Sequence, residues 1–198
     1  MISVIGDSFT SGESPPGEEY IPWCDLLQEK LNKKVVNLNR QDLLSDRPAE
    51  VYSTSTNFFM MEKLEEYKSI LDKSELFIFQ WTAPLRDDED IKSDTPSIED
   101  KQMYSDLDYR EKKLMTMCWD MLCNLNIKCP MIFWSWRDFT NLDLYWYNKY
   151  DCGIRWNTND KHIKPLLVNE LNDPHPNQDG HEWISEEILR FIKKKNYL

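Results

Sequence analysis

Short apolar runs alternate along the chain with longer stretches in which apolar side chains recur every three or four residues. The short runs predict buried strands, and the longer stretches predict amphipathic helices that pack on them. The expected strands span 2–5, 35–38, 75–81 and 131–136, and the expected helices span 23–34, 49–71, 107–125 and 178–195.

This order of elements is typical of a parallel sheet with right-handed crossovers and helices on both faces. We therefore predict a three-layer α/β/α sandwich with a mainly parallel sheet of four to five strands. The 198 residues match the size of one domain, so residues 1–198 are expected to share one core. In such a sheet, functional groups gather beyond the carboxyl ends of the strands. The loops that begin near Gly6, Asn39, Trp81 and Trp136 should meet at that rim.

Composition narrows the functional classes. The formal net charge is -11, which opposes binding to a phosphate backbone, because such binding depends on clustered Lys and Arg. The basic cluster Lys193–Lys195 falls in the last turn of the expected final helix, where it complements the helix dipole. We therefore expect no nucleic-acid partner.

The cysteine pattern and the first residues bear on location. The five cysteines are scattered without C-x-x-C spacing, which favours a reducing compartment over a disulfide framework or a zinc site. Met1 leads directly into the first apolar run, without the segments of a signal peptide, and no run is long enough to span a bilayer. A cytoplasmic or otherwise reducing location, with no membrane partner, is the expectation.

Candidate chemistry begins directly after the first expected strand, in Gly6-Asp7-Ser8. A serine there can present its hydroxyl at the rim while its own backbone N–H points at the same space, although an ordinary turn explains the tripeptide as well. Of the three histidines, His175 has a carboxylate, Asp173, two residues before it in a loop stiffened by prolines. Asp173 could orient the ring while the other nitrogen faces a hydroxyl; a surface-loop histidine is the alternative.

Two blocks at opposite ends of the chain carry a resemblance to a known family. GDSFTSGE at 6–13 resembles the first block of the SGNH (GDSL-type) hydrolases, and DPHPNQDGHEWISEEI at 173–188 resembles their last block. The resemblance implies a flavodoxin-like fold and a serine esterase. It implies that Ser8 attacks an ester carbonyl, that His175 takes and returns the proton, and that Asp173 orients His175. This chemistry requires no metal or organic cofactor.

The middle blocks depart from the family pattern. Where the family has a glycine that helps to bind the oxyanion, Asp42 stands nearest, and a carboxylate there is unfavourable unless it turns away. In place of the family's asparagine donor, Gln80-Trp81-Thr82 resembles a form met in some phage-associated members, so Thr82 or Gln80 is expected to donate instead. This form also favours a viral or bacterial source. A lost donor costs about 3 kcal/mol of transition-state stabilisation, which leaves a slow or degenerate enzyme as an alternative.

Aromatic residues are dense between Phe133 and Trp156. Most are expected in the core or in a contact between subunits of a homo-oligomer, while Trp136 and Tyr145 are candidates for stacking on a sugar ring. We predict that the chain removes a small acyl group, such as acetyl, from a carbohydrate ester. The alternatives are a non-catalytic binding module and an O-acyltransferase that uses the same serine. His181 is expected to have a structural role rather than to bind a metal.

Overall fold

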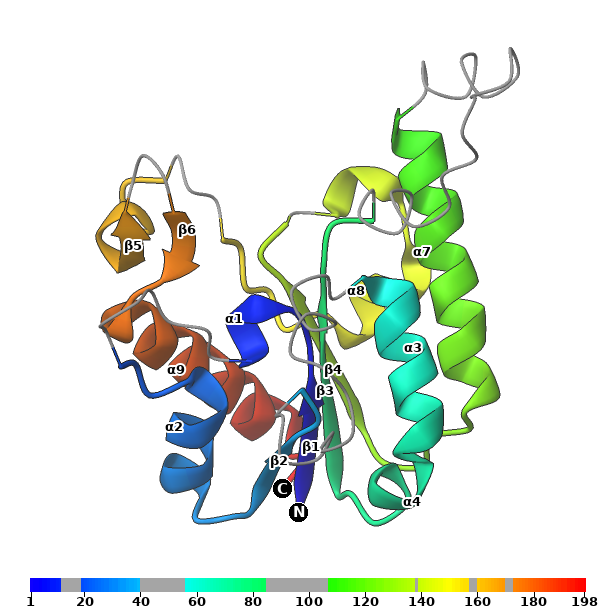
Figure 1. The fold of residues 1–198 in the computed structure, drawn as a ribbon, viewed down its shortest axis with the longest axis horizontal. Helices are drawn as coiled ribbons and strands as arrows, with labels where there is room; N and C mark the ends of the chain where they lie inside the picture. The colour runs from blue at the N-terminus through cyan, green and yellow to red at the C-terminus, as the bar shows by residue number, and fades with distance from the viewer. Residues whose placement is uncertain (12–18, 40–55, 85–106, 138, 157–159, 170–172) are drawn as a thin grey trace.

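Parallel strands form the centre of the molecule (Figure 1). The computed structural model describes residues 1–11, 19–39, 56–84, 107–137, 139–156, 160–169 and 173–198, and within these residues four strands make one sheet in the order β2-β1-β3-β4. All neighbouring strands of this sheet run parallel. The strands are β1 (Ile2–Ile5), β2 (Val35–Asn37), β3 (Leu76–Trp81) and β4 (Met131–Ser135).

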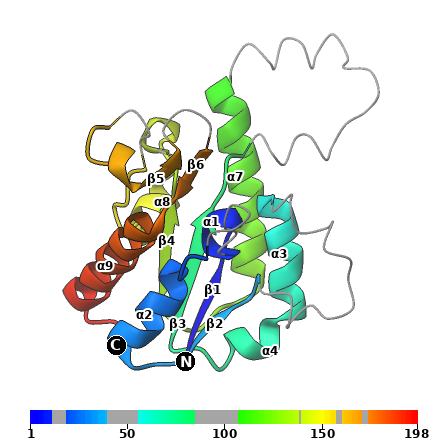
Figure 2. The same cartoon turned by 60° about the vertical axis from the view of Figure 1, so that its left-hand side comes forward.

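Helices cover both faces of the sheet (Figures 1 and 2). Because side chains alternate along a strand, each strand supplies both cores. The helices are α2 (Trp23–Leu31), α3 (Asn57–Glu66), α7 (Leu107–Asn124), α8 (Tyr145–Tyr150) and α9 (Gln178–Lys195). In β3, Phe77 and Phe79 belong to the core beneath α3, α7 and α8, whereas Leu76 and Ile78 belong to the core beneath α2 and α9. The predicted three-layer fold is confirmed.

The order of the strands reverses direction between β1 and β3. The chain leaves β1 to form β2 on one side, and later returns to the other side of β1 to form β3. Connections that lead away in opposite directions open a crevice at this point, and ligands of such sheets bind there. Ile5 pairs with Phe79 in the last register of these two strands, so Gly6 and Gln80 directly follow the last pair at this switch point.

A short antiparallel ladder was missed by the sequence analysis. β5 (Leu167–Asn169) pairs with β6 (Asp173–Pro176), where we expected a loop. The prolines at 174 and 176 argued against a strand, because proline cannot donate a backbone hydrogen bond. An edge strand tolerates proline where the missing N–H would point out of the ladder, and β6 has a single partner strand among the described residues.

Helix boundaries differ from the expected ones for local reasons. The helix expected over 23–34 ends at Leu31, because Asn32 adopts a left-handed conformation with φ 50° and caps it. The helix expected over 49–71 is divided into α3 and α4 (Lys68–Leu71), with the non-helical Tyr67 between them, and residues 49–55 lie outside the described part of the chain. The strands and the final helix match their expected ranges closely.

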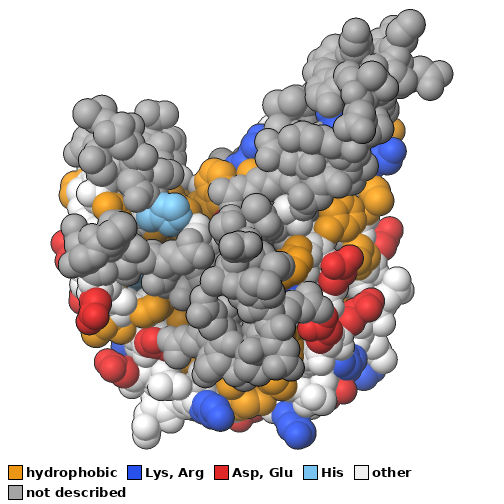
Figure 3. All heavy atoms as spheres, viewed as in Figure 1, with side chains coloured by type: hydrophobic (Ala, Val, Ile, Leu, Met, Phe, Trp, Pro, Cys, Tyr) orange, Lys and Arg blue, Asp and Glu red, His pale blue; other side chains and the backbone are white. Residues whose placement is uncertain are grey.

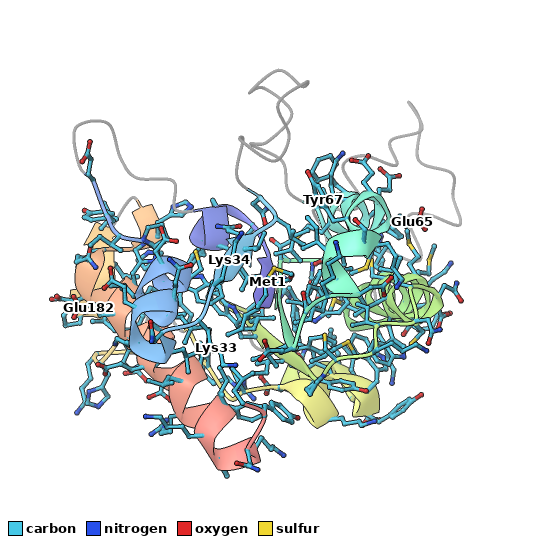
Figure 4. All side chains as sticks on the ribbon, turned by 90° about the horizontal axis from the view of Figure 1, so that it is seen from below. Met1, Lys33, Lys34, Glu65, Tyr67 and Glu182 are labelled. Atoms are coloured by element: carbon cyan, nitrogen blue, oxygen red, sulfur yellow. The ribbon has the colours of Figure 1, made fainter. Side chains whose placement is uncertain are left out.

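Ion pairs join the elements at the amino ends of the strands. Glu75, directly before β3, contacts the amino group of Met1 and Nζ of Lys33, each at 2.6 Å. Hydrogen bonds from Lys33 and then from the terminal ammonium lower the pKa of Glu75 from 4.5 to about 2. Figure 4 shows Met1, Lys33 and Lys34 close together at this edge, where the N–H of Ile2 donates to the carbonyl of Lys34 at 2.9 Å.

Candidate active site

Ser8 opens a single helical turn, α1 (Ser8–Ser11), three positions beyond the end of β1. Asp7 shapes this turn from both its backbone and its side chain. Its carbonyl accepts from the N–H of Thr10 at 2.9 Å, and its Oδ1 accepts from the N–H of Phe9 at 3.0 Å. These bonds fix the backbone on either side of Ser8, so the serine is held at the rim rather than carried on a loose loop.

A glycine is required at position 6, because the backbone there lies against the side chain of Gln80 in β3. A Cβ at this position would lie 2.5 Å from Oε1 and 2.6 Å from Cβ of Gln80, and it would also meet Oγ1 of Thr10. Contacts this short force neighbouring atoms to move. The glycine therefore lets β1 approach the Gln80 side chain closely enough for the turn that follows.

His175 meets Ser8 across the rim. Ser8 Oγ and His175 Nε2 are 2.7 Å apart, although 167 positions separate the residues. The imidazole lies in β6, and Asn177 directly after this strand caps α9 by accepting from the N–H of Gly180 at 3.0 Å. The Asn177 side chain also donates to the carbonyl of Pro165 at 2.9 Å, which ties the cap to the segment before β5. The expected proximity of serine and histidine is thus present.

Two of the other expected site residues fall partly or wholly outside the described part of the chain. Asp173 opens β6, where its backbone pairs with Asn169, but its side chain is not among those described. Asp42 lies outside the described residues altogether. Both expected roles therefore stay predictions.

Asp7 joins the serine turn to β3 and to the end of β4. Its Oδ2 accepts from the indole Nε1 of Trp136 at 2.7 Å, and its Oδ1 accepts from Nε2 of Gln80. The side-chain Oε1 of Gln80 in turn accepts from the hydroxyl of Thr10. Gln80 is fully buried and uses both ends of its amide in these contacts, so they brace the turn and give no support to its predicted role as an oxyanion donor.

Asparagine side chains clamp the backbone at the ends of β1 and β3. The amide of Asn39 accepts from the N–H of Gly6 at 2.9 Å and donates to the carbonyl of the same residue. The amide of Asn57 accepts from the N–H of Thr82 at 3.0 Å and donates to its carbonyl at 3.2 Å. Each amide thus continues the hydrogen bonding of a strand beyond the last paired residue. The sequence analysis missed both, because an asparagine after a strand or at a helix start reads as an ordinary turn or cap.

Thr82 remains the candidate side-chain donor for an oxyanion. Its side chain is fully buried, and its Oγ1 makes no hydrogen bond to any residue that the structure describes. A buried hydroxyl without a partner is costly in an ordinary core, so such a group often has a functional reason. The clamp by Asn57 keeps the Thr82 backbone in place at the end of β3.

Aromatic rings surround Phe9, the residue after the serine. Its ring centroid lies 5.0 Å from that of His175 and 6.1 Å from that of Trp136, which it stacks on at an interplanar angle of 12°. Trp156 meets the same ring edge-on at 6.0 Å. Trp136 and His175 thus both contact the Phe9 ring, and the predicted role of Trp136 in substrate binding stays a prediction. Tyr145, the other candidate for sugar stacking, is 81% exposed on α8.

His181 is buried one turn into α9 and packs under α2. Its Nδ1 accepts from the N–H of Trp23 at 3.4 Å, and its ring lies 6.3 Å from that of Tyr20. Burial, followed by the charge of His175, lowers the pKa of His181 from 6.5 to about 4. The residue is therefore neutral near pH 7, and these contacts fit the structural role that we expected.

The surface charges, possible metal ligands and apolar helices of the described residues were compared with what other functions would need. On the face shown in Figure 3, basic side chains lie among acidic ones, and a histidine is visible beside hydrophobic side chains. Within the described residues, no group of three or more His, Cys, Asp or Glu side chains is arranged to hold a metal ion. None of the helices in that part of the chain has both the length and the apolar character needed to cross a bilayer.

Comparisons with known proteins give one distant likeness to report. No protein-family model matches the chain, and no curated protein matches it. The crystal structure of the lipase Lip_vut3 from a goat rumen metagenome resembles it with a TM-score of 0.46 and 13% sequence identity, over 96% of this chain and 96% of that chain. A likeness this distant carries no argument about activity, and the α/β class rests on the sheet order and flanking helices described above.

Proposed function

We propose that the chain is a serine ester hydrolase, with Ser8 as the nucleophile and His175 as its base. The observation that carries this proposal is the 2.7 Å contact between Ser8 Oγ and His175 Nε2. A serine hydroxyl is a weak nucleophile until a positioned base removes its proton. The contact lies at the carboxyl ends of the strands, where such sheets bind their ligands.

The reaction follows from this pair. With the ring proton on Nδ1, Nε2 of His175 takes the hydroxyl proton as Ser8 Oγ bonds to the carbonyl carbon. The tetrahedral intermediate then expels the alcohol oxygen, which receives that proton from His175. Water attacks the resulting acyl-serine, gives its proton to His175, and releases the acid as Ser8 regains a proton. We propose that Asp173 orients the ring through Nδ1, as the resemblance implies.

The negative charge on the carbonyl oxygen requires donors. We assign the side-chain donor to Thr82, because its buried hydroxyl makes no hydrogen bond within the described residues. The backbone N–H of Ser8 is the second donor, by analogy with other serine hydrolases. Asp42 is proposed to stand near the third position that the family uses, where its carboxylate would slow the reaction.

For the substrate, we propose a small acyl ester of a carbohydrate. The support is the family resemblance of the two terminal blocks. An acyl series from acetyl to octanoyl on p-nitrophenol, followed by an acetylated sugar, tests the acyl and alcohol sides separately. A preference for long chains would contradict this choice while leaving the serine chemistry intact.

The decisive experiment is covalent labelling with a fluorophosphonate, read by mass spectrometry of the Ser8 peptide. We expect wild type to be labelled, and Ser8→Ala to lose labelling together with at least a thousandfold of its p-nitrophenyl acetate turnover. Ser74→Ala serves as the matched control, because Ser74 contacts Ser3 at the opposite end of the sheet. Equal turnover by wild type and Ser8→Ala would contradict the proposal.

The alternatives give distinct outcomes in the same assay. A binding module of the same fold would show neither labelling nor an initial burst of p-nitrophenol. An O-acyltransferase would show labelling and a burst, and its turnover would rise when acceptor sugars are added. Hydrolysis that is insensitive to acceptor sugars supports the esterase.

A further inference from the structure

The ring of Phe9 lies against the ring of His175. The two centroids are 5.0 Å apart with an interplanar angle of 33°, which is a packing contact rather than a distant approach. Phe9 is only 5% exposed. It is also the residue next to Ser8, and its backbone N–H is bound to Oδ1 of Asp7 at 3.0 Å. The same residue therefore touches the base with its ring and fixes the serine turn with its backbone.

Other aromatic side chains hold the Phe9 ring in place. Trp136 stacks on it at 6.1 Å, and Trp156 meets it edge-on at 6.0 Å. Trp136 cannot turn freely, because its indole N–H donates to Oδ2 of Asp7 at 2.7 Å. A line of contacts thus runs from the Asp7 carboxylate through Trp136 and Phe9 to the imidazole of His175.

We propose that Phe9 is a positioning residue that keeps His175 directed at Ser8, with Trp136 as its backing. This inference rests on the proposed serine chemistry for its functional meaning, but the contact itself can be tested without any substrate. Proton transfer requires the imidazole to stay within hydrogen-bond reach of the serine through each step. A ring packed on one side of the imidazole limits its rotation about the side-chain bonds.

The aromatic face also suits the charge that His175 acquires. When His175 takes the serine proton it becomes a cation, and a cation within about 6 Å of an aromatic centroid is attracted by the ring's quadrupole. A leucine of similar bulk would pack against the imidazole without that attraction. The Phe9 ring can therefore attract the imidazolium while it exists in the transition state.

Trp136 then supports Phe9 instead of stacking on a sugar ring. The indole N–H is engaged by Asp7, and one ring face stacks on Phe9, so the described contacts use the side chain for support. A sugar-stacking residue would affect binding of sugar esters alone. A backing residue should affect small esters and sugar esters alike.

The main test compares Phe9→Leu with wild type in two assays. On p-nitrophenyl acetate and on an acetylated sugar, we expect kcat to fall about tenfold with KM unchanged, because the loss is of positioning and charge stabilisation. Without substrate, diethyl pyrocarbonate should modify His175 several times faster in Phe9→Leu than in wild type. Mass spectrometry follows the His175 peptide, and exposed His162 is the internal reference.

The outcomes are separable. An unchanged modification rate at His175 and a kcat within twofold of wild type would overturn the proposal. If wild type hydrolyses no ester, the serine chemistry fails, and the modification rate alone still decides whether Phe9 holds His175. Should Phe9→Leu not fold, Trp136→Phe keeps an aromatic ring beside Phe9 while it removes the N–H bond to Asp7 and part of the stacked area; we expect a fall in kcat of about threefold for both esters. A rise in KM confined to the sugar ester would assign Trp136 to substrate binding and overturn its backing role.

Discussion

The two ends of the central sheet are held together by different physics. At the carboxyl ends, buried groups such as Asp7, Gln80 and Asn57 bind one another and the backbone. At the amino ends, Glu75 pairs with the Met1 ammonium and with Lys33 at the surface, where the Glu75 side chain is 50% exposed. The hydrogen bonds at the buried end hold the side chains in one arrangement, whereas the ion pairs at the exposed end mainly neutralise opposite charges.

This difference predicts how each end responds to change. Removing the partner of a buried donor costs about 1–3 kcal/mol, because the orphaned group stays out of water. An exposed ion pair contributes about 0–1 kcal/mol, since water and salt screen it. Substitutions at the site end should therefore disturb both stability and activity, and those at the opposite end should disturb neither strongly.

The largest effect is expected for Asp7→Ala. It removes the acceptor for the N–H groups of Phe9, Trp136 and Gln80, so we expect a loss of about 3 kcal/mol in the free energy of unfolding. Ester turnover should fall by at least a hundredfold, because both Ser8 and Phe9 lose their support. Urea unfolding and p-nitrophenyl acetate kinetics measure the two effects. Asp72→Ala, at an exposed aspartate bound to Lys68, is the control; equal losses in both variants would contradict the contrast between the ends.

An intermediate effect is expected from acid acting on His181. Its folded pKa of about 4 lies below the usual 6.5, so the unfolded chain binds more protons between these values and stability falls with decreasing pH. From pH 7 to pH 5 this group should cost about 2 kcal/mol. His181→Gln should flatten the pH dependence of urea unfolding over this range, whereas His162→Gln at an exposed position should not. An identical slope in both variants would show that other groups dominate.

The smallest effect is expected for Glu75→Gln. The folded pKa of Glu75 is lowered to about 2, so its contribution to stability is present above about pH 4.5 and is lost as the pH falls toward 2. At pH 7 the variant should keep wild-type esterase kinetics, and any change in Tm should shrink in 0.5 M salt because exposed charges are screened. A change in kcat would show that the amino ends of the strands are coupled to the site.

The sequence was sufficient for those parts of the fold that depend on local patterns. Apolar runs such as 76–81 form strands, and the spacing of Ile184 and Ile188 forms the core face of α9. The fold inferences needed only periodicity and topology. The pairing of Ser8 with His175 needed the resemblance of the two terminal blocks to the SGNH hydrolases as well, because topology alone places only the loop after the first strand at the rim.

The rest depends on contacts that leave no pattern. The clamps by Asn39 and Asn57 require knowing which backbone each amide meets in space. The bond from Trp136 to Asp7 joins positions 129 apart, so neither residue reveals it alone. The β5–β6 ladder was hidden by its prolines, which usually mark loops.

The close packing of Gly6 against the side chain of Gln80 limits which substitutions related sequences can accept. Even alanine at position 6 would press on the Gln80 side chain, so the smallest mutational step there is already blocked. The same Cβ would also meet Oγ1 of Thr10, so a lineage could leave glycine only after positions 10 and 80 had both made room. Gln80 in turn is bound to Asp7 and Thr10. In an alignment of relatives, positions 6, 7, 10 and 80 should therefore change together or not at all. In a saturation library, tolerance at position 6 should emerge only among clones that already carry smaller residues at positions 10 and 80.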